Sequence, residues 1–111
     1  MNVFSWLTGR FSSRGKALSL YRRGMAKSKQ HDHEGAIDDY TTTIGMQDVP
    51  TDVKAMALYN RALVYAAAGN GPRAASDLNT VLGMTEALPN VKAEARRKLA
   101  RMQRGSTRAS P

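Results

Sequence analysis

The residues with the clearest capacity for chemistry lie together, where His31, Asp32, His33 and Glu34 follow one another in the chain. Imidazole and carboxylate groups bind metals, but a zinc site usually needs three or four well-placed ligands, and the two histidines alternate along an expected loop. We therefore interpret these four as exposed loop residues and expect no metal. The chain contains no Cys, which excludes disulfides, thiolate metal sites and a cysteine nucleophile.

Other catalytic patterns are also missing from the sequence. The Gly-Asn-Gly-Pro turn at 69–72 lacks the Lys and the Ser or Thr that complete a phosphate-binding loop. Ser and Thr are plentiful, yet none stands in a sequence context that pairs it with His and a carboxylate. We expect a protein without catalytic residues, cofactor or enzymatic activity.

Charged residues are distributed in blocks. The 111 residues carry 17 Lys and Arg against 9 Asp and Glu, which gives a formal net charge of +8. Residues 1–30 hold no acid, residues 31–52 hold no Lys or Arg, and the chain is strongly basic again from residue 90. Such blocks occur on solvated helical faces, and they also recruit anionic partners. Association with nucleic acid or the ribosome through residues 92–108 is therefore the alternative to protein binding.

The chain also repeats itself at a shift of 38 residues. Lys-Ala at 16–17 recurs at 54–55 and 92–93, and five residues within 36–46 recur as identical residues within 74–84. Self-similarity at a fixed period of this length is the signature of a repeat architecture. The sequence therefore contains two units and the first half of a third.

Within each unit, apolar residues fall at three- and four-residue steps, which predicts helices. The expected fold is all-α, with antiparallel helical hairpins stacked on one another and a last helix that caps the stack. The expected helices cover 15–30, 33–46, 52–69, 72–84 and 90–104. The expected organisation is an N-terminal segment (1–14), a repeat domain (15–104, with units 15–51 and 52–89 and a capping helix 90–104), and a disordered basic tail (105–111).

Helix ends have their own signals at matching repeat positions. A short polar side chain before a helix can accept a hydrogen bond from an unpaired amide. The expected N-caps are Asp32, Asn70, Asp52 and Asn90. Pro72 suits a first helical turn, and Gly45 and Gly83 lie where a left-handed residue would end a helix.

The spacing of small residues resembles the tetratricopeptide repeat. In that family a small residue on the first helix of a unit meets a small residue on the second helix twelve positions later, as Gly24 does with Ala36 and Ala62 with Ala74. A large residue follows four positions later, at Tyr40 and Leu78. Tyr65 fits the aromatic residue of the family's first helix. The sequence departs from the family in its period, 38 instead of 34, in Lys27 where an aromatic is expected, and in Arg23 and Arg61 where leucine is usual.

The resemblance implies a helical solenoid that binds another chain in a concave groove lined by the first helices. Apolar and methionine side chains with arginines at one end suit a peptide that carries acidic residues. The matching positions are Leu18, Tyr21, Arg22, Met25, Met56, Tyr59, Asn60, Leu63, Arg97, Lys98 and Arg101. Asn60 also falls on a position used by family members that clamp a terminal carboxylate, but Tyr21, Met25 and Glu94 replace the other clamp residues.

Residues 1–14 precede the repeat and carry Phe4, Trp6, Leu7 and Phe11 among small and basic residues. Their composition leaves open packing on the domain or in the groove, contact with an anionic membrane surface, and organelle targeting. No apolar run approaches the roughly 20 residues of a membrane-spanning helix. Because the absence of Cys fits a reducing compartment, we expect the cytoplasm. Two full units are few for a repeat fold, so self-association through an exposed end is a further candidate interaction.

Overall fold

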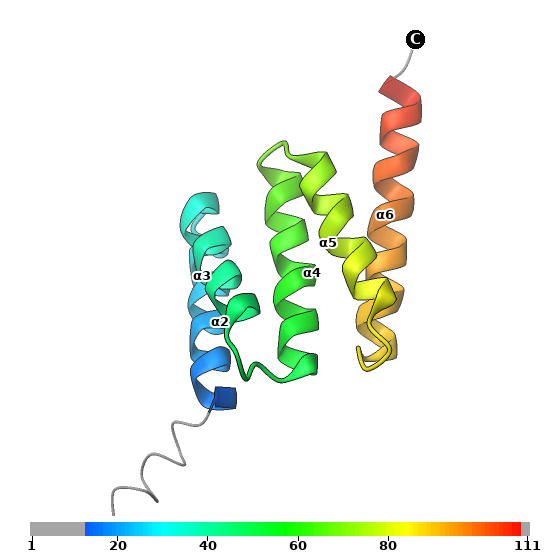
Figure 1. The fold of residues 1–111 in the computed structure, drawn as a ribbon. Coiled ribbons are helices and arrows are strands. Elements are labelled where there is room, and N and C mark those ends of the chain that lie inside the picture. Colours follow the sequence, from blue (N-terminus) through cyan, green and yellow to red (C-terminus); the bar gives the residue numbers. More distant parts are fainter. Residues whose placement is uncertain (1–12, 110–111) are drawn as a thin grey trace, which may run out of the picture.

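The computed structural model describes residues 13–109, and in this range the chain forms five α-helices and no strand (Figure 1). The predicted all-α fold is thereby confirmed. Residues 110–111 and residues 1–12, most of the predicted N-terminal segment, lie outside the described residues. The helices are α2 (Ser13–Lys29), α3 (His33–Gly45), α4 (Thr51–Ala67), α5 (Gly71–Gly83) and α6 (Pro89–Ala109).

The first four of these helices begin and end within two residues of the predicted bounds. The last helix, α6, instead continues to Ala109. Residues 105–109, which we expected in a disordered tail, are therefore helical. None of the described helices is both long and apolar enough to cross a membrane.

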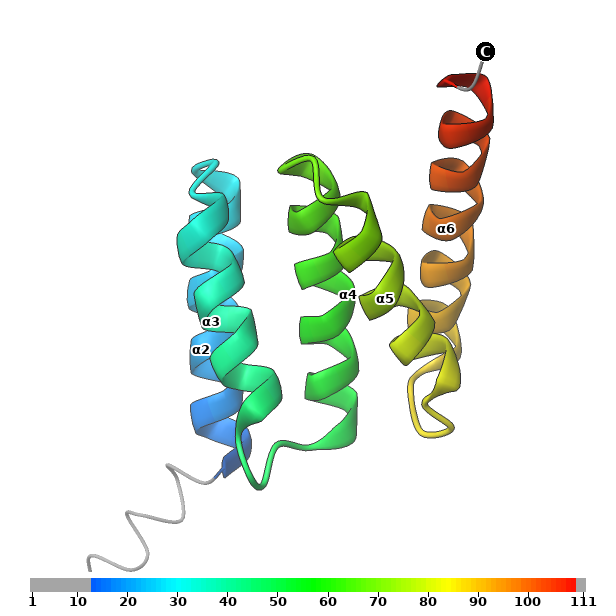
Figure 2. The same ribbon diagram turned by 45° about the horizontal axis from the view of Figure 1, so that its top comes forward.

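Each helix packs against the next one along the chain, and α4 lies at the centre of the structure. It contacts α3 and α5, its neighbours in sequence, and also α2 and α6. Figures 1 and 2 show that the chain reverses direction at each connection and that the C-terminal part of α6 extends past the end of α5. The helices α2, α4 and α6 therefore form a contiguous series through α4.

The two connections within the units use the same local geometry. Asp32 Oδ1 accepts a hydrogen bond from the amide of Gly35 at 2.9 Å, and Asn70 Oδ1 accepts one from the amide of Arg73 at 3.2 Å. Both predicted N-caps are thereby confirmed, and Pro72 lies in the first turn of α5 as predicted. The residue before each cap has a left-handed backbone, with φ of 61° at His31 and 84° at Gly69.

The left-handed conformation predicted for two helix ends is wrong. Gly45 and Gly83 are the last residues of α3 and α5, but among the described residues only His31 and Gly69 have a left-handed φ. These two helices end instead by turning into extended backbone at the following methionine.

Asp52 and Asn90 also fail as N-caps, because each lies inside its helix. The helix α4 follows Pro50 without a side-chain cap, and the Asp52 carboxylate pairs with Arg14 at 2.9 Å. Asn90 is the second residue of α6, where its Oδ1 accepts a hydrogen bond from the adjacent amide of Val91. The shared polar residue at these positions therefore marks the start of a helix without capping it.

The core contains small residues where helices approach closely and large ones beside them. Ala36 and Ala62 are completely buried, and a Cβ added to Gly24 would lie 2.7 Å from Cε1 of Tyr40. Gly24 therefore makes the room that the buried Tyr40 ring occupies. Burial of such a large side chain contributes about 2–3 kcal/mol to folding.

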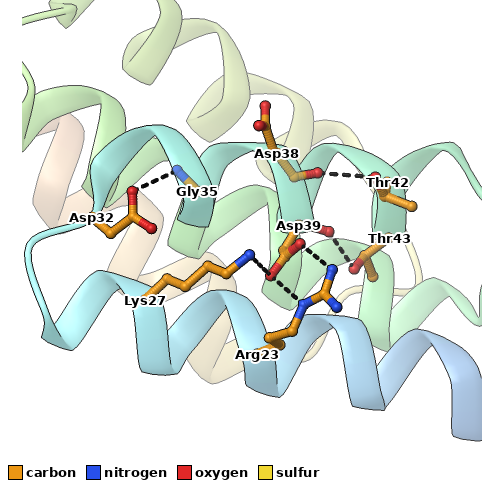
Figure 3. Close-up of polar contacts among 8 residues, drawn as sticks. All are labelled: Arg23, Lys27, Asp32, Gly35, Asp38, Asp39, Thr42 and Thr43. Atoms are coloured by element: carbon orange, nitrogen blue, oxygen red, sulfur yellow. Dashed lines mark hydrogen bonds and ion pairs between the residues drawn. The ribbon is translucent and has the colours of Figure 1, made fainter.

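Two ion pairs account for the arginines at positions 23 and 61. In the first unit, Nε and Nη2 of Arg23 donate to the two oxygens of Asp39, both at 2.8 Å. In the second unit, Arg61 donates to Asp77 with the same atoms and distances. Figure 3 shows that Lys27 also reaches Asp39, at 3.0 Å. Each pair ties the first helix of a unit to the second.

Candidate functional site

The eleven residues predicted to bind a partner all lie on α2, α4 and α6, the helices connected through α4. We refer to these eleven residues as the face. The structure brings four of them, Tyr21, Met25, Met56 and Asn60, to the contact between α2 and α4. Asn60 Nδ2 donates to the Tyr21 hydroxyl oxygen and to the carbonyl oxygen of Met56, both at 2.9 Å. Tyr21 and Met25 also pack against the buried cluster formed by α3 and α4.

These hydrogen bonds limit what Asn60 can offer a partner. A side-chain amide has two N–H donors and a carbonyl acceptor, and both donors of Asn60 are used within the chain. A carboxylate needs a donor, so a carboxylate clamp would first require these bonds to break. Asn60 therefore positions the Tyr21 ring and leaves its own Oδ1 as an acceptor.

Tyr59 connects the face to α6. Its ring is partly buried against the main core cluster. Burial raises the pKa of its hydroxyl, Glu94 raises that pKa further, and Arg101 and Arg97 lower it. The Tyr59 hydroxyl therefore lies within electrostatic reach of three charged side chains on α6. Arg97 is paired with Glu94, whereas Arg101 is exposed and has no ion pair among the described residues.

The remaining predicted residues are less closely linked. Leu18, Leu63 and Lys98 are partly buried, and Arg22 is exposed. No hydrogen bond or ion pair joins Arg22 to the rest of the face within the described part of the chain. The predicted residues thus form two regions. One contains tyrosine, methionine and asparagine side chains between α2 and α4, and the other contains Tyr59 and the arginines between α4 and α6.

Two hollows among the described residues are lined by other side chains. One, of about 370 Å³, lies between α5 and α6. The other, of about 500 Å³, lies between α3, α4 and α5, and we refer to it as the inter-unit cleft. Its lining residues are Ile37, Asp38, Thr41, Arg61, Tyr65, Arg73, Ser76 and Asp77.

Sequence reasoning missed the inter-unit cleft because its lining residues are spread over forty positions. One signal was present in the repeat. Tyr65 and Arg73 align with Lys27 and Gly35, so two of the cleft residues are absent from the first unit.

The prediction that residues 31–34 are all exposed loop residues is wrong, because His33 and Glu34 begin α3 and His33 is partly buried. The rings of His31 and His33 are 6.5 Å apart between centroids. Within residues 13–109, no group of three His, Asp or Glu side chains is arranged to hold a metal ion.

Comparison of the chain with models of protein families, with curated proteins and with solved structures finds no match. Function is therefore inferred from the residues and their geometry alone.

Proposed function

We propose that this chain is a non-catalytic binding module of the tetratricopeptide type. The pairs α2–α3 and α4–α5 are its two units, and α6 covers the second. Three observations support this assignment. The ion pairs Arg23–Asp39 and Arg61–Asp77 have the same geometry in both units. The left-handed residues His31 and Gly69 recur 38 residues apart. Each helix packs against the next.

The capping role of α6 follows from its sequence in the same register. On α4, the positions that face α5 include Leu58, Arg61 and Tyr65, which are buried or partly buried. Of their counterparts on α6, Arg96 is exposed, whereas Leu99 and Gln103 line the hollow between α5 and α6. A polar outer face is what a terminal helix of a repeat stack requires for solubility.

The partner that we propose for the face of α2, α4 and α6 is a peptide or protein segment with acidic side chains. The observation that carries this proposal is that Tyr59 packs against the core cluster that includes Ala95 of α6, the helix that also carries Arg97 and Arg101. An apolar side chain of the partner would lie on the tyrosine and methionine region while a carboxylate meets the arginines, since charge-assisted bonds to guanidinium are strong and directional. This arrangement needs no cofactor.

The test compares two charge reversals on α6 that change the net charge equally. The variant Arg97→Glu/Arg101→Glu alters the proposed face, and Lys92→Glu/Arg96→Glu alters a different side of the same helix. Proteins retained from a lysate of the source cells at about 0.15 M salt, where surface charges are screened beyond roughly 8 Å, are identified after nuclease treatment. We expect the first variant to lose a protein that the wild type and the second variant both retain.

If both variants retain that protein, or both lose it, the arginine end of the face does not recognise the partner. Far-UV circular dichroism of each variant shows whether the helices remain. The Asn60→Ala variant then separates the two regions of the face, because it releases Tyr21 without changing the charge.

A second candidate function rests on a different observation. Arg101 and Arg104 on α6 are exposed and have no carboxylate partner among the described residues. These side chains could contact successive phosphates of a nucleic acid. Affinity built from six or more phosphate contacts falls by about a thousandfold or more between about 50 and 200 mM salt, whereas a complex anchored by apolar contacts weakens only modestly. Retention of RNA or DNA with this salt dependence would favour the second function.

A further inference from the structure

The inter-unit cleft contains a free cation and a free anion on different walls. Four charged residues line it: Arg61, Asp77, Arg73 and Asp38. Arg61 and Asp77 bind each other through two hydrogen bonds of 2.8 Å, so their charges cancel. Neither the Arg73 guanidinium nor the Asp38 carboxylate makes a hydrogen bond or ion pair within the described residues. The cleft therefore presents one unpaired charge of each sign.

The Arg73 guanidinium is held in place without being neutralised. It lies over the ring of Tyr65, at 5.8 Å from the ring centroid, and the Arg61 guanidinium lies 5.5 Å from the same centroid. Arg61 is fixed by Asp77 and by a hydrogen bond from Nη1 to the hydroxyl of Thr41 on α3. Cation–π contact orients an arginine but leaves its N–H donors available. Arg73 is thus a preoriented donor group at an exposed position.

Asp38 supplies the opposite wall. It lies on α3 beside Asp39, but the two carboxylates have different surroundings. Asp39 points to Arg23 and Lys27, while Figure 3 shows the Asp38 carboxylate directed away from that group. The Asp38 carboxylate has no hydrogen bond among the described residues, and the Thr42 hydroxyl donates to the backbone oxygen of Asp38 at 3.0 Å. The Asp38 side chain therefore remains exposed as an acceptor for a positively charged group.

The charge pattern selects the class of ligand. A polyanion would meet Asp38 and a polycation would meet Arg73, so neither suits the cleft. Small-molecule sites are usually enclosed and mostly apolar, whereas this cleft exposes Asp38, Thr41, Arg73 and Ser76 to solvent. A side-chain pair presented by another chain fits such an open, polar surface better than a ligand that must be surrounded.

We propose that the inter-unit cleft binds a peptide segment carrying one acidic and one basic side chain, with the acidic group on Arg73 and the basic group on Asp38. The site is separate from the face proposed above. At 3.6 residues per turn, Arg61 and Tyr65 lie on the side of α4 opposite Met56, Asn60 and Leu63. The cleft residues Tyr65 and Arg73 have no counterparts in the first unit, where Lys27 and Gly35 occupy the aligned positions.

The proposal is tested on the full chain by NMR titration with short peptides whose ends are acetylated and amidated. The probes contain one Glu and one Lys separated by one, two or three glycines. Matched peptides replace Glu or Lys by Gln. The signals followed are the Arg73 side-chain Nε–H and the Ser76 backbone amide. We expect at least one probe with both charges to shift these signals with half-saturation on the order of 1–10 mM, as for a small ligand held by two charged contacts. Each Gln-containing probe should need about tenfold more, which corresponds to about 1.4 kcal/mol per contact.

Three variants locate the effect. Arg73→Gln and Asp38→Asn each weaken the response at Ser76 by about tenfold. The control Arg96→Gln removes an equal positive charge from an exposed position on α6 and leaves the titration unchanged. The proposal is overturned by equal responses to the single-charge probes, by titrations that neither variant alters, or by the absence of any response at ten times the stated concentration. None of these outcomes depends on the face of α2, α4 and α6.

Discussion

Arg23 and Arg61 occupy the same position in the two units and make the same bidentate contact with an aspartate, yet they differ in exposure and in neighbours. The Arg23 side chain is 61% exposed and shares Asp39 with Lys27. The Arg61 side chain is 17% exposed and is the sole ion-pair partner of Asp77 among the described residues. The shared contact belongs to the architecture of a unit, whereas the neighbours are specific to each unit.

The difference arises from the position of each unit in the chain. The α3 helix lies beside Arg61, so that Nη1 of Arg61 reaches Thr41. Arg23 has no such neighbour, because no described helix precedes α2. Where the first unit has Lys27, a second cation for Asp39, the second unit has Tyr65, a ring that two guanidinium groups contact. Comparison of the two units therefore separates residues that maintain the fold, which recur in both units, from candidate binding residues, which occur in one.

The largest effect should come from removing the two arginines singly. Arg61→Ala leaves the Asp77 carboxylate, which is 8% exposed, without a cation, and we expect a loss of about 3 kcal/mol in unfolding free energy. Arg23→Ala should cost only about 1 kcal/mol, because Lys27 still pairs with Asp39 and Arg23 is largely solvated. Urea unfolding followed by circular dichroism measures both values.

The role of Lys27 sharpens this comparison. If Lys27 compensates for the loss of Arg23, the double variant Arg23→Ala/Lys27→Ala should lose nearly as much stability as Arg61→Ala. Equal losses from the two single substitutions would show that the surroundings of the pairs do not matter.

A second prediction exchanges the packing of the two units. Gly24→Ala places a Cβ against the Tyr40 ring, and overpacking of this kind costs about 1–3 kcal/mol. The second unit has Ala62 and Leu78 at the same positions. Gly24→Ala should therefore be much less costly when combined with Tyr40→Leu, with a coupling energy of about 1–2 kcal/mol in a double-mutant cycle. Additive losses would mean that the backbone shifts to relieve the contact instead.

Most local features that recur in both units could be predicted from the sequence, whereas features specific to one unit could not. The helices and the caps Asp32 and Asn70 were predictable because the repeat presents each local signal twice. Asp52 and Asn90 were wrongly predicted as N-caps, because a polar residue is favoured within a first helical turn as well as before it. The role of Arg23 and Arg61 could not be predicted, because only the structure shows that each pairs with a carboxylate sixteen residues later.

The inter-unit cleft could not be predicted for a different reason. Its side chains come from α3, α4 and α5, and whether Arg73 meets Tyr65 depends on how one unit packs on the other. Local periodicity contains no information about that packing. The residues of the face, by contrast, could be predicted from their matching positions on the first helix of each unit. The sequence did not show that both N–H donors of Asn60 form hydrogen bonds within the chain.

A third prediction concerns acid stability. Hydrogen bonding from Arg23, aided by Lys27, lowers the pKa of Asp39 from 3.8 to about 2, against the opposing effect of burial. A depressed pKa in the folded state gives stability that is present above the unfolded pKa and lost as the pH falls through the folded one. Unfolding free energy should therefore fall by about 1–2 kcal/mol between pH about 4 and 2.

The carboxylate responsible can be identified by substitution. Asp39→Asn removes the titrating group, so the slope over this pH range should become shallower by the amount that Asp39 supplies. Asp52→Asn is the matched control, since the pKa of Asp52 is also lowered by Arg14 but its carboxylate is much more exposed than that of Asp39. An unchanged slope in Asp39→Asn would assign the acid sensitivity to other carboxylates.

The smallest effect is expected at the two left-handed residues, where the second unit has the more favourable residue, glycine. His31 has φ of 61° and Gly69 has φ of 84° at the equivalent position. This conformation is less favourable by about 1–2 kcal/mol for a residue with a Cβ, but not for glycine. Glycine, however, loses more backbone entropy on folding. We expect His31→Gly to raise the unfolding free energy by about 0.5–1 kcal/mol, and Gly69→Ala to lower it by about 1 kcal/mol. Urea denaturation of both variants tests the pair. A loss of stability in His31→Gly would show that the contact of its ring with His33 contributes more than the backbone conformation costs.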